Sequence, residues 1–280
     1  MSNFKLSAFA DEYADSFDEQ LSALNRFGIS HIELRHLDGI NISLLPTEQI
    51  IEAKKKMDTY GIRASAIGSP LGKIKLDADI NAHLETAKRV FETANIMDTR
   101  FVRIFSFYAP DGMKITGMKN EVTTALYDMV SLAEKYGVTL CHENEACIYG
   151  DTPARCRDLL DCFDGKLKCV FDMGNFVLEG IDPYPEAYEI LKKDIAYFHI
   201  KDALADGAIV PPGKGDAKIK EIISAHKEYS TDDFIVSLEP HLQTFSGLNA
   251  LVGRSFNNPY KYENTQFAFT DAVTKIRELI

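Results

Sequence analysis

The stretch VTLCHENEACIYGD, from Val138 to Asp151, joins a short apolar run to a group of charged side chains. Its first part, Val138–Glu143, is rich in β-branched and apolar residues, which is typical of a buried strand. Glu143 stands at the end of this run. A charge at the end of a buried strand costs desolvation free energy and adds little stability by itself. Its position therefore indicates a functional site.

Seven more runs of this kind occur along the chain. They are Phe4–Phe9, His31–Arg35, Arg63–Gly68, Phe101–Ser106, Lys168–Asp172, Ala196–Ile200 and Phe234–Glu239. Longer amphipathic patterns lie between them, as expected for helices. Two of these patterns, 16–28 and 47–61, end at a glycine, which is a common signal for the end of a helix.

The alternation of strands and helices predicts an α/β protein with parallel strands and right-handed crossovers. Eight units fit a closed (β/α)₈ TIM barrel better than an open doubly wound sheet. No GxGxxG motif follows the first strand. We expect residues 1–280 to form one domain. The segment 242–265 is long for a connection, so we expect a lid, a dimer contact or packing on the barrel itself.

Composition narrows the classes of function. The net charge of −11 argues against a protein that binds the nucleic-acid backbone. Five cysteines without a CxxC motif suggest neither a disulfide framework nor a zinc knuckle. No apolar run approaches the ~18 residues of a membrane span, and the first residues lack a signal-peptide pattern. We therefore expect a cytoplasmic protein without nucleic-acid or membrane partners.

Four residues take equivalent places in the last four strands. Side chains alternate between the two faces of a strand, and in each of these strands the apolar residues belong toward the helices. This places one metal-ligand type per strand in the barrel mouth: Glu143, Asp172, His199 and Glu239. The carboxyl ends of the strands meet on the face where active sites of this fold lie. We therefore expect the four side chains to converge.

Three carboxylates in one cleft would have raised pKa values unless a cation lies among them. A set of oxygens with one imidazole suits Mn²⁺, Mg²⁺, Co²⁺ or Zn²⁺ in an open site. Taken singly, each residue could be a helix cap or a loop residue. Four such coincidences at equivalent strand ends are harder to explain, so the pattern predicts one divalent metal ion.

At these residues the sequence resembles the sugar phosphate isomerase/epimerase family, also called the xylose isomerase-like barrels. The resemblance covers essentially the whole chain. It is strongest in HENE (142–145), FDMGN (171–175), FHIKD (198–202) and SLEPH (237–241). It implies that the four residues bind one metal ion, and that Glu143 and Glu239 also move protons.

The resemblance implies an isomerase or epimerase of a small keto-sugar, polyol or sugar phosphate. The metal would stabilise an enediolate while the glutamates remove and return a proton. A lyase of the inosose dehydratase type is the alternative, because the same groups can expel a β-hydroxyl. Less expected are a repair endonuclease, whose additional histidine ligands the early strands lack, and a non-catalytic sugar-binding protein. Substrate, metal and oligomeric state stay open, with a homodimer possible.

Five further residues are candidates for substrate contact: Asn175, Lys73, Arg103, Lys201 and Lys214. Ketose 3-epimerases often carry a histidine at the position of Asn175, so ketose specificity does not transfer. Arg103 has the parity of an inward residue and is expected to pair with a carboxylate more readily than with substrate. Lys201 would orient the neighbouring histidine or contact substrate. For Lys73 and Lys214 a solvated surface role is the alternative.

Overall fold

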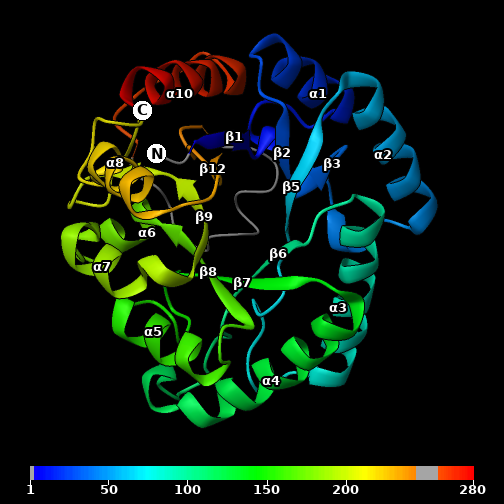
Figure 1. Cartoon of the computed structure of the whole chain (residues 1–280), viewed down its shortest axis with the longest axis vertical. Helices are drawn as coiled ribbons and strands as arrows, with labels where there is room; N and C mark the ends of the chain where they lie inside the picture. Colours follow the sequence, from blue (N-terminus) through cyan, green and yellow to red (C-terminus); the bar gives the residue numbers. More distant parts are fainter. Residues whose placement is uncertain (1–2, 244–257) are drawn as a thin grey trace.

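The computed structural model describes residues 3–243 and 258–280, and it shows eight parallel strands alternating with helices. The barrel strands are β1 (Phe4–Ala8), β2 (His31–Leu34), β5 (Arg63–Gly68), β6 (Phe101–Ile104), β7 (Thr139–Glu143), β8 (Leu167–Asp172), β9 (Ile195–Ile200) and β12 (Phe234–Leu238). All eight strands expected from the sequence are present, and the (β/α)₈ prediction is confirmed (Figure 1).

The strands form one sheet in the order β1-β12-β9-β8-β7-β6-β5-β2. Every pairing in it is parallel. The two end strands, β1 and β2, contact each other, although no ladder joins them in the described part of the chain. The barrel is therefore nearly closed. Its register places Asp172 of β8 directly beside His199 of β9.

Helices surround the strands in a ring (Figure 1). They are α1 (Phe17–Arg26), α2 (Thr47–Tyr60), α3 (Ile80–Ile96), α4 (Lys119–Tyr136), α5 (Pro153–Cys162), α6 (Met173–Leu178), α7 (Tyr188–Leu191), α8 (Ile219–Tyr229) and α10 (Thr265–Leu279). Gly61 ends α2 with a φ of 67°, a left-handed conformation that a residue without Cβ adopts without strain. The first helix ends at Arg26 with Phe27 as its C-cap, and Gly28 follows in the left-handed conformation, with a φ of 63°, as expected of a glycine that stops a helix.

Hydrophobic side chains fill two layers, as the alternation along each strand requires. Leu140, Phe171 and Phe198 belong to the large core that includes buried residues of the helices. Cys141 and Val170 belong to a small second cluster, which is completed by Ala66 and Tyr197. Burial of one Phe or Leu side chain stabilises the fold by about 1.5–3 kcal/mol. The outer layer therefore supplies most of the hydrophobic stabilisation.

Short hairpins extend two strands: β3 (His36–Leu37) with β4 (Ile40–Asn41), and β10 (Asp202–Ala203) with β11 (Ile209–Val210). The Asp202 carboxylate accepts hydrogen bonds from the backbone N–H groups of Gly213, Gly215 and Ala217, at 2.7, 2.9 and 3.1 Å. A Cβ on Gly215 would lie 2.2 Å from Asp202 Oδ1, so only glycine fits there. One buried carboxylate thus fixes the loop that follows β11.

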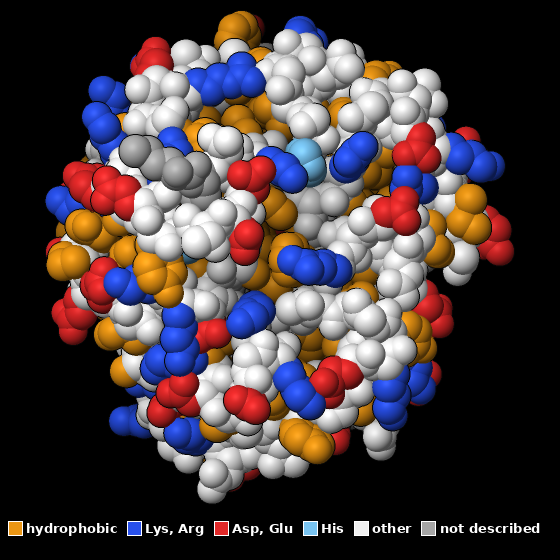
Figure 2. Space-filling view, in the orientation of Figure 1, with side chains coloured by type: hydrophobic (Ala, Val, Ile, Leu, Met, Phe, Trp, Pro, Cys, Tyr) orange, Lys and Arg blue, Asp and Glu red, His pale blue; other side chains and the backbone are white. Residues whose placement is uncertain are grey.

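Most of the segment for which a lid or dimer contact was expected lies outside the described residues, including Phe245, Leu248 and Phe256. Of its described part, Tyr262 packs against the main core and donates a hydrogen bond to Asp271. Figure 2 shows a hollow at the centre of the ring, with Lys and Arg side chains around it. Among the described residues, no helix is both long and apolar enough to span a bilayer.

Candidate metal centre

Four strand ends bring Glu143, Asp172, His199 and Glu239 together. Glu143 ends β7, Asp172 ends β8, His199 is the penultimate residue of β9, and Glu239 directly follows β12. Each offers one ligand atom, and these atoms all lie within 4.8 Å of one another. None of the four residues is more than 3% exposed. The expected convergence of the four side chains is therefore observed.

His199 Nδ1 is the centre of this cluster. It lies 3.1 Å from Glu143 Oε1, 3.5 Å from Glu239 Oε2 and 3.9 Å from Asp172 Oδ2. Asp172 Oδ2 is buried and accepts no hydrogen bond from the described residues, although the Lys201 ammonium lies 3.0 Å away. Three carboxylates and one imidazole that face a common point form a donor set suited to a divalent cation.

The surrounding charges favour a cation as well. Six buried carboxyl groups lie in and around the cluster: Asp11, Glu12, Glu33, Glu143, Asp172 and Glu239. Three permanently charged side chains face them in the described structure: Arg35, Arg103 and Lys201. Buried charges are stable only when they are paired. Burial raises the pKa of Glu12 to about 8 and that of Asp172 to about 7, so these carboxyl groups tend to keep a proton, whose place a bound dication would take.

The environment separates the carboxyl groups by their pKa values. Burial raises the pKa of Asp172 to about 7, although Lys201 opposes this rise. Burial acts in the same direction on Glu143, but His199 and Arg103 outweigh it and lower the pKa of Glu143 to about 2. For His199, burial disfavours the charged ring, but Glu33 and Glu143 raise its pKa well above 6.5. A dication would therefore take the place of the proton on Nδ1.

Each of the two candidate proton-transfer glutamates is held by a buried arginine. Arg103 Nη1 lies 3.2 Å from Glu143 Oε2, and Arg35 Nη1 lies 2.7 Å from Glu239 Oε1. The ring of Phe9 lies under both guanidinium groups, with its centroid 4.3 Å from Arg35 Cζ and 5.3 Å from Arg103 Cζ. The two carboxylates are thereby fixed in orientation.

Three of the five residues expected to contact substrate lie at the cluster. Asn175 donates from Nδ2 to Asn144 O at 2.8 Å and to Glu143 Oε1 at 3.4 Å. Lys201 Nζ lies between Asp172 and Glu239, at 3.0 and 3.4 Å. Arg103 pairs with Glu143, as its inward parity indicated. These three groups contact the carboxylates of the cluster and restrict their orientation.

The other two residues are placed differently. Lys73 Nζ lies 3.2 Å from Glu145 Oε2 and over the ring of Phe105, at 4.3 Å from its centroid. It is partly buried after the third barrel strand. Lys214 is exposed in the loop that Asp202 fixes, and no ion pair joins it to the cluster within the described ranges. The structure therefore does not bring Lys214 to the metal-ligand residues.

Several buried charged residues escaped the sequence analysis. Glu33 and Arg35 lie on β2 and just after it, and the alternation applied to the other strands would have turned them inward, because Ile32 and Leu34 belong to the outer core. Glu12 lies in a short turn after β1 and forms a second possible group of metal ligands with Glu239 and His241. No strand periodicity covers that turn.

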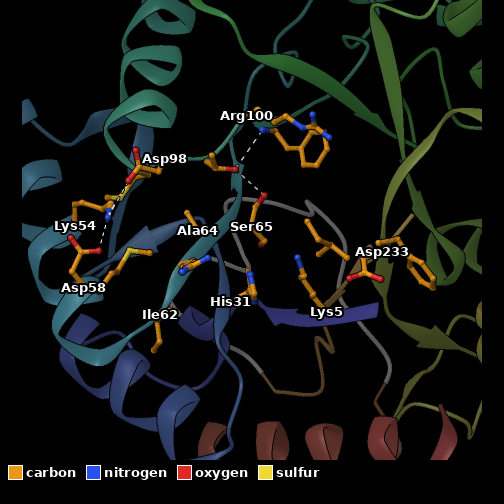
Figure 3. A pocket seen from close by; sticks show the side chains of 17 residues that line it. Lys5, His31, Lys54, Asp58, Ile62, Ala64, Ser65, Asp98, Arg100 and Asp233 are labelled. Atoms are coloured by element: carbon orange, nitrogen blue, oxygen red, sulfur yellow. Dashed lines mark hydrogen bonds and ion pairs between the residues drawn. The ribbon is translucent and has the colours of Figure 1, made fainter. Parts of the chain in front are cut away.

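A cavity of about 670 Å³ lies elsewhere, below the amino-terminal ends of the strands (Figure 3). Lys5, His31 and Asp233 are among its lining residues. Lys54, which also lines it, is paired with Asp58 and Asp98. No group of metal-ligand side chains is found at this end among the described residues. Among the described residues, the possible metal ligands therefore lie at the carboxyl ends of the strands.

Comparison with known proteins gives the same architecture. The family model described as xylose isomerase-like TIM barrel matches residues 21–256. No curated protein matches the chain. Two similar solved structures, each 18% identical with a TM-score of 0.74, are a probable 3-DHS dehydratase, AsbF, from Bacillus anthracis and the IOLI protein with a bound zinc atom. The first alignment covers 98% of both chains, and the second covers 99% of this chain and 98% of the other.

A third similar structure is D-psicose 3-epimerase with D-tagatose from Clostridium cellulolyticum H10. It is 15% identical, with a TM-score of 0.72 and coverage of 99% of both chains. Identities this low establish a shared fold, and the chemistry has to be argued from the cluster itself.

Proposed function

The chain belongs to the xylose isomerase-like TIM barrel family, and we propose that it is a divalent-metal-dependent isomerase or epimerase of a small keto-sugar, polyol or sugar phosphate. One observation carries this proposal. Two buried glutamates, Glu143 and Glu239, flank the same cluster of metal-ligand atoms, and each is oriented by its own arginine.

Glu143, Asp172, His199 and Glu239 would hold the ion, which is Mn²⁺, Mg²⁺, Co²⁺ or Zn²⁺ by the chemistry of the donor set. When bound, such an ion polarises a substrate carbonyl or hydroxyl and acidifies the neighbouring C–H bond. The IOLI structure contains zinc in a barrel of the same fold, which supports the proposal.

Glu143 and Glu239 transfer the proton that leaves and returns to the substrate carbon. Glu143 is ionised at neutral pH, since its pKa is lowered to about 2, and it can accept a proton from carbon. Return of that proton to the adjacent carbon gives isomerisation. Epimerisation needs a proton delivered by Glu239 to the opposite face of the same carbon. Burial raises the pKa of Glu239, but Lys201 and His241 outweigh burial and hold it well below 4.5, so Glu239 first takes this proton from water. Lys201 and Asn175 donate hydrogen bonds and keep both the carboxylates and the substrate oxygens in place.

A dehydratase is the second candidate, and Lys201 favours it. Burial lowers the pKa of this lysine, but Asp172 and Glu239 outweigh burial and raise it, so the ammonium is kept charged beside the glutamates. An ammonium in that position can donate a hydrogen bond to a departing β-hydroxyl after the C–H bond has been broken, while the proton that the hydroxyl needs comes from the glutamate that took it from carbon. The similar fold of the probable dehydratase AsbF agrees with this alternative without deciding it.

The test starts with the metal content of the purified protein and continues with a panel of ketoses and polyols in D₂O with added Mn²⁺. Deuterium in recovered or isomerised sugar, without loss of water, supports the isomerase or epimerase. A product that has lost water supports the lyase. Absence of metal uptake together with absence of exchange on the whole panel would refute both. Glu52→Gln, on the exposed surface of α2, is the matched control for the variants Glu143→Gln and Glu239→Gln.

A further inference from the structure

Glu33 lies behind the candidate metal centre and contacts its histidine. Glu33 Oε2 is 3.0 Å from His199 Nε2, while His199 Nδ1 faces the cluster. Tyr197 donates from its hydroxyl to the other oxygen, Glu33 Oε1, at 2.9 Å. The side chains of Glu33 and His199 have no exposed surface. A carboxylate with both oxygens engaged thus holds the rear of the imidazole ring.

The fold brings Glu33 there for a local reason. Ile32 and Leu34 pack in the outer core, so Glu33 between them points into the barrel. The register of β2 against β5 shifts at this point, because Ile32 pairs with Ala64 and Glu33 with Ala66, which leaves Ser65 of β5 as the extra residue. The rings of Phe9 and Tyr197 lie 5.1 and 5.5 Å from that of His199 and restrict its rotation.

An ionised carboxylate can only accept hydrogen bonds, so the imidazole nitrogen beside it must carry hydrogen. Nε2 therefore keeps its proton toward Glu33, and Nδ1 is the nitrogen left to bind a cation. A carboxylate on the far nitrogen of a ligating histidine fixes the ring and increases its basicity. Loss of such a partner typically weakens metal binding by about 10- to 100-fold.

We propose that Glu33 is a positioning residue, which holds His199 with Nε2–H directed away from the cluster so that Nδ1 alone binds the metal. The inference rests on the proposed metal site but adds a residue and a tautomer to it. Tyr197 is part of the same arrangement, because its hydroxyl occupies the second oxygen of Glu33 and directs the first toward His199.

The experiment measures Zn²⁺ affinity of the full chain by competition with a chromophoric chelator, for the unmodified protein, Glu33→Ala and Glu33→Gln. We expect Glu33→Ala to weaken Zn²⁺ binding by about 10- to 100-fold, and Glu33→Gln to weaken it less, because its amide oxygen still accepts from Nε2–H. Asp194→Ala is the matched control: this buried carboxylate precedes β9 at the opposite end and pairs with Arg157 and Lys168. Its Zn²⁺ affinity should equal that of the unmodified protein.

A second readout does not depend on the variants folding. In the ¹⁵N-histidine-labelled, Zn²⁺-loaded protein, the His199 signal should report metal on Nδ1 and a solvent-protected proton on Nε2. Metal on Nε2, or a folded Glu33→Ala that binds Zn²⁺ as tightly as the control, overturns the proposal. An unmodified protein that takes up no Zn²⁺ refutes the metal site itself, which separates the two failures.

Discussion

Arg35 donates from Nη1 to Glu239 Oε1 at 2.7 Å, across 204 positions of sequence. The same guanidinium donates to both oxygens of Asp11, at 2.8 and 3.0 Å. One buried cation thus joins the turn after β1, the end of β2 and the end of β12. Of these strands, β1 and β2 lie on either side of the gap in the sheet. Barrel closure and the orientation of a candidate catalytic carboxylate depend on the same side chain.

Arg35→Met should destabilise the protein by about 3–5 kcal/mol, because it leaves buried carboxylates without their cation. The free energy of unfolding measured with urea checks this. Arg63→Met, at an exposed arginine on the neighbouring strand β5, should stay within about 0.5 kcal/mol of the unmodified protein. Equal stability of the two variants would show that the Arg35 contacts contribute nothing net.

Glu143→Gln and Glu239→Gln should each lower the rate of solvent deuterium exchange into substrate by about 10²–10⁴-fold, since each removes a group that transfers a proton. The measurement is isotope incorporation at saturating metal, so that weaker ion binding is not the cause. Glu52→Gln should exchange at the unmodified rate. If only one of the two variants loses exchange, a single glutamate serves as both acid and base.

Asp202→Ala should release the loop after β11, because three backbone N–H groups lose their acceptor. A buried donor left without a partner costs about 1–3 kcal/mol, so we expect lower stability and faster proteolysis within residues 210–218. Asp202→Asn keeps one accepting oxygen, so its stability and its rate of proteolysis should lie between those of Asp202→Ala and the unmodified protein. Mass spectrometry of the first cleavage products locates the cut; a cut elsewhere, at unchanged stability, would contradict this role.

His226 should make the protein less stable in mild acid. It is packed between Phe198 and Phe234, and burial lowers its pKa from 6.5 to about 4. Above pH 6.5 this histidine is neutral in both the folded and the unfolded protein. Between pH 6.5 and pH 4 only the unfolded chain binds this proton. The free energy of unfolding therefore falls as the pH is lowered through this range, by up to about 3 kcal/mol. Urea unfolding of the unmodified protein and His226→Phe at several pH values should diverge in this window; parallel curves would refute it.

A bound metal should stabilise the folded chain, because the four ligands are assembled only in the native state. At an ion concentration one hundred times Kd the gain is about 2.7 kcal/mol. Thermal unfolding with Mn²⁺ or Zn²⁺, compared with excess chelator, measures it. Asp172→Asn should lose most of this difference, whereas Asp194→Asn, in the ion pairs with Arg157 and Lys168, should keep it.

The sequence by itself determined the eight strands, their alternation with helices, and the inward direction of Glu143, Asp172, His199 and Glu239. Hydrophobic periodicity is local, and it holds wherever the chain lies in space. The same rule would have turned Glu33 and Arg35 inward, but nothing in β2 shows what they would meet there.

Only the tertiary structure decided the partners. Glu33 contacts His199 across 166 positions, and Glu12 accepts from the backbone N–H of His241 across 229. Such pairs depend on strand register, on the register shift between β2 and β5 and on the approach of β1 to β2 as the barrel closes. These are relations between distant strands. No local pattern encodes them, because each strand's own periodicity is satisfied in any register that keeps its apolar face toward the helices.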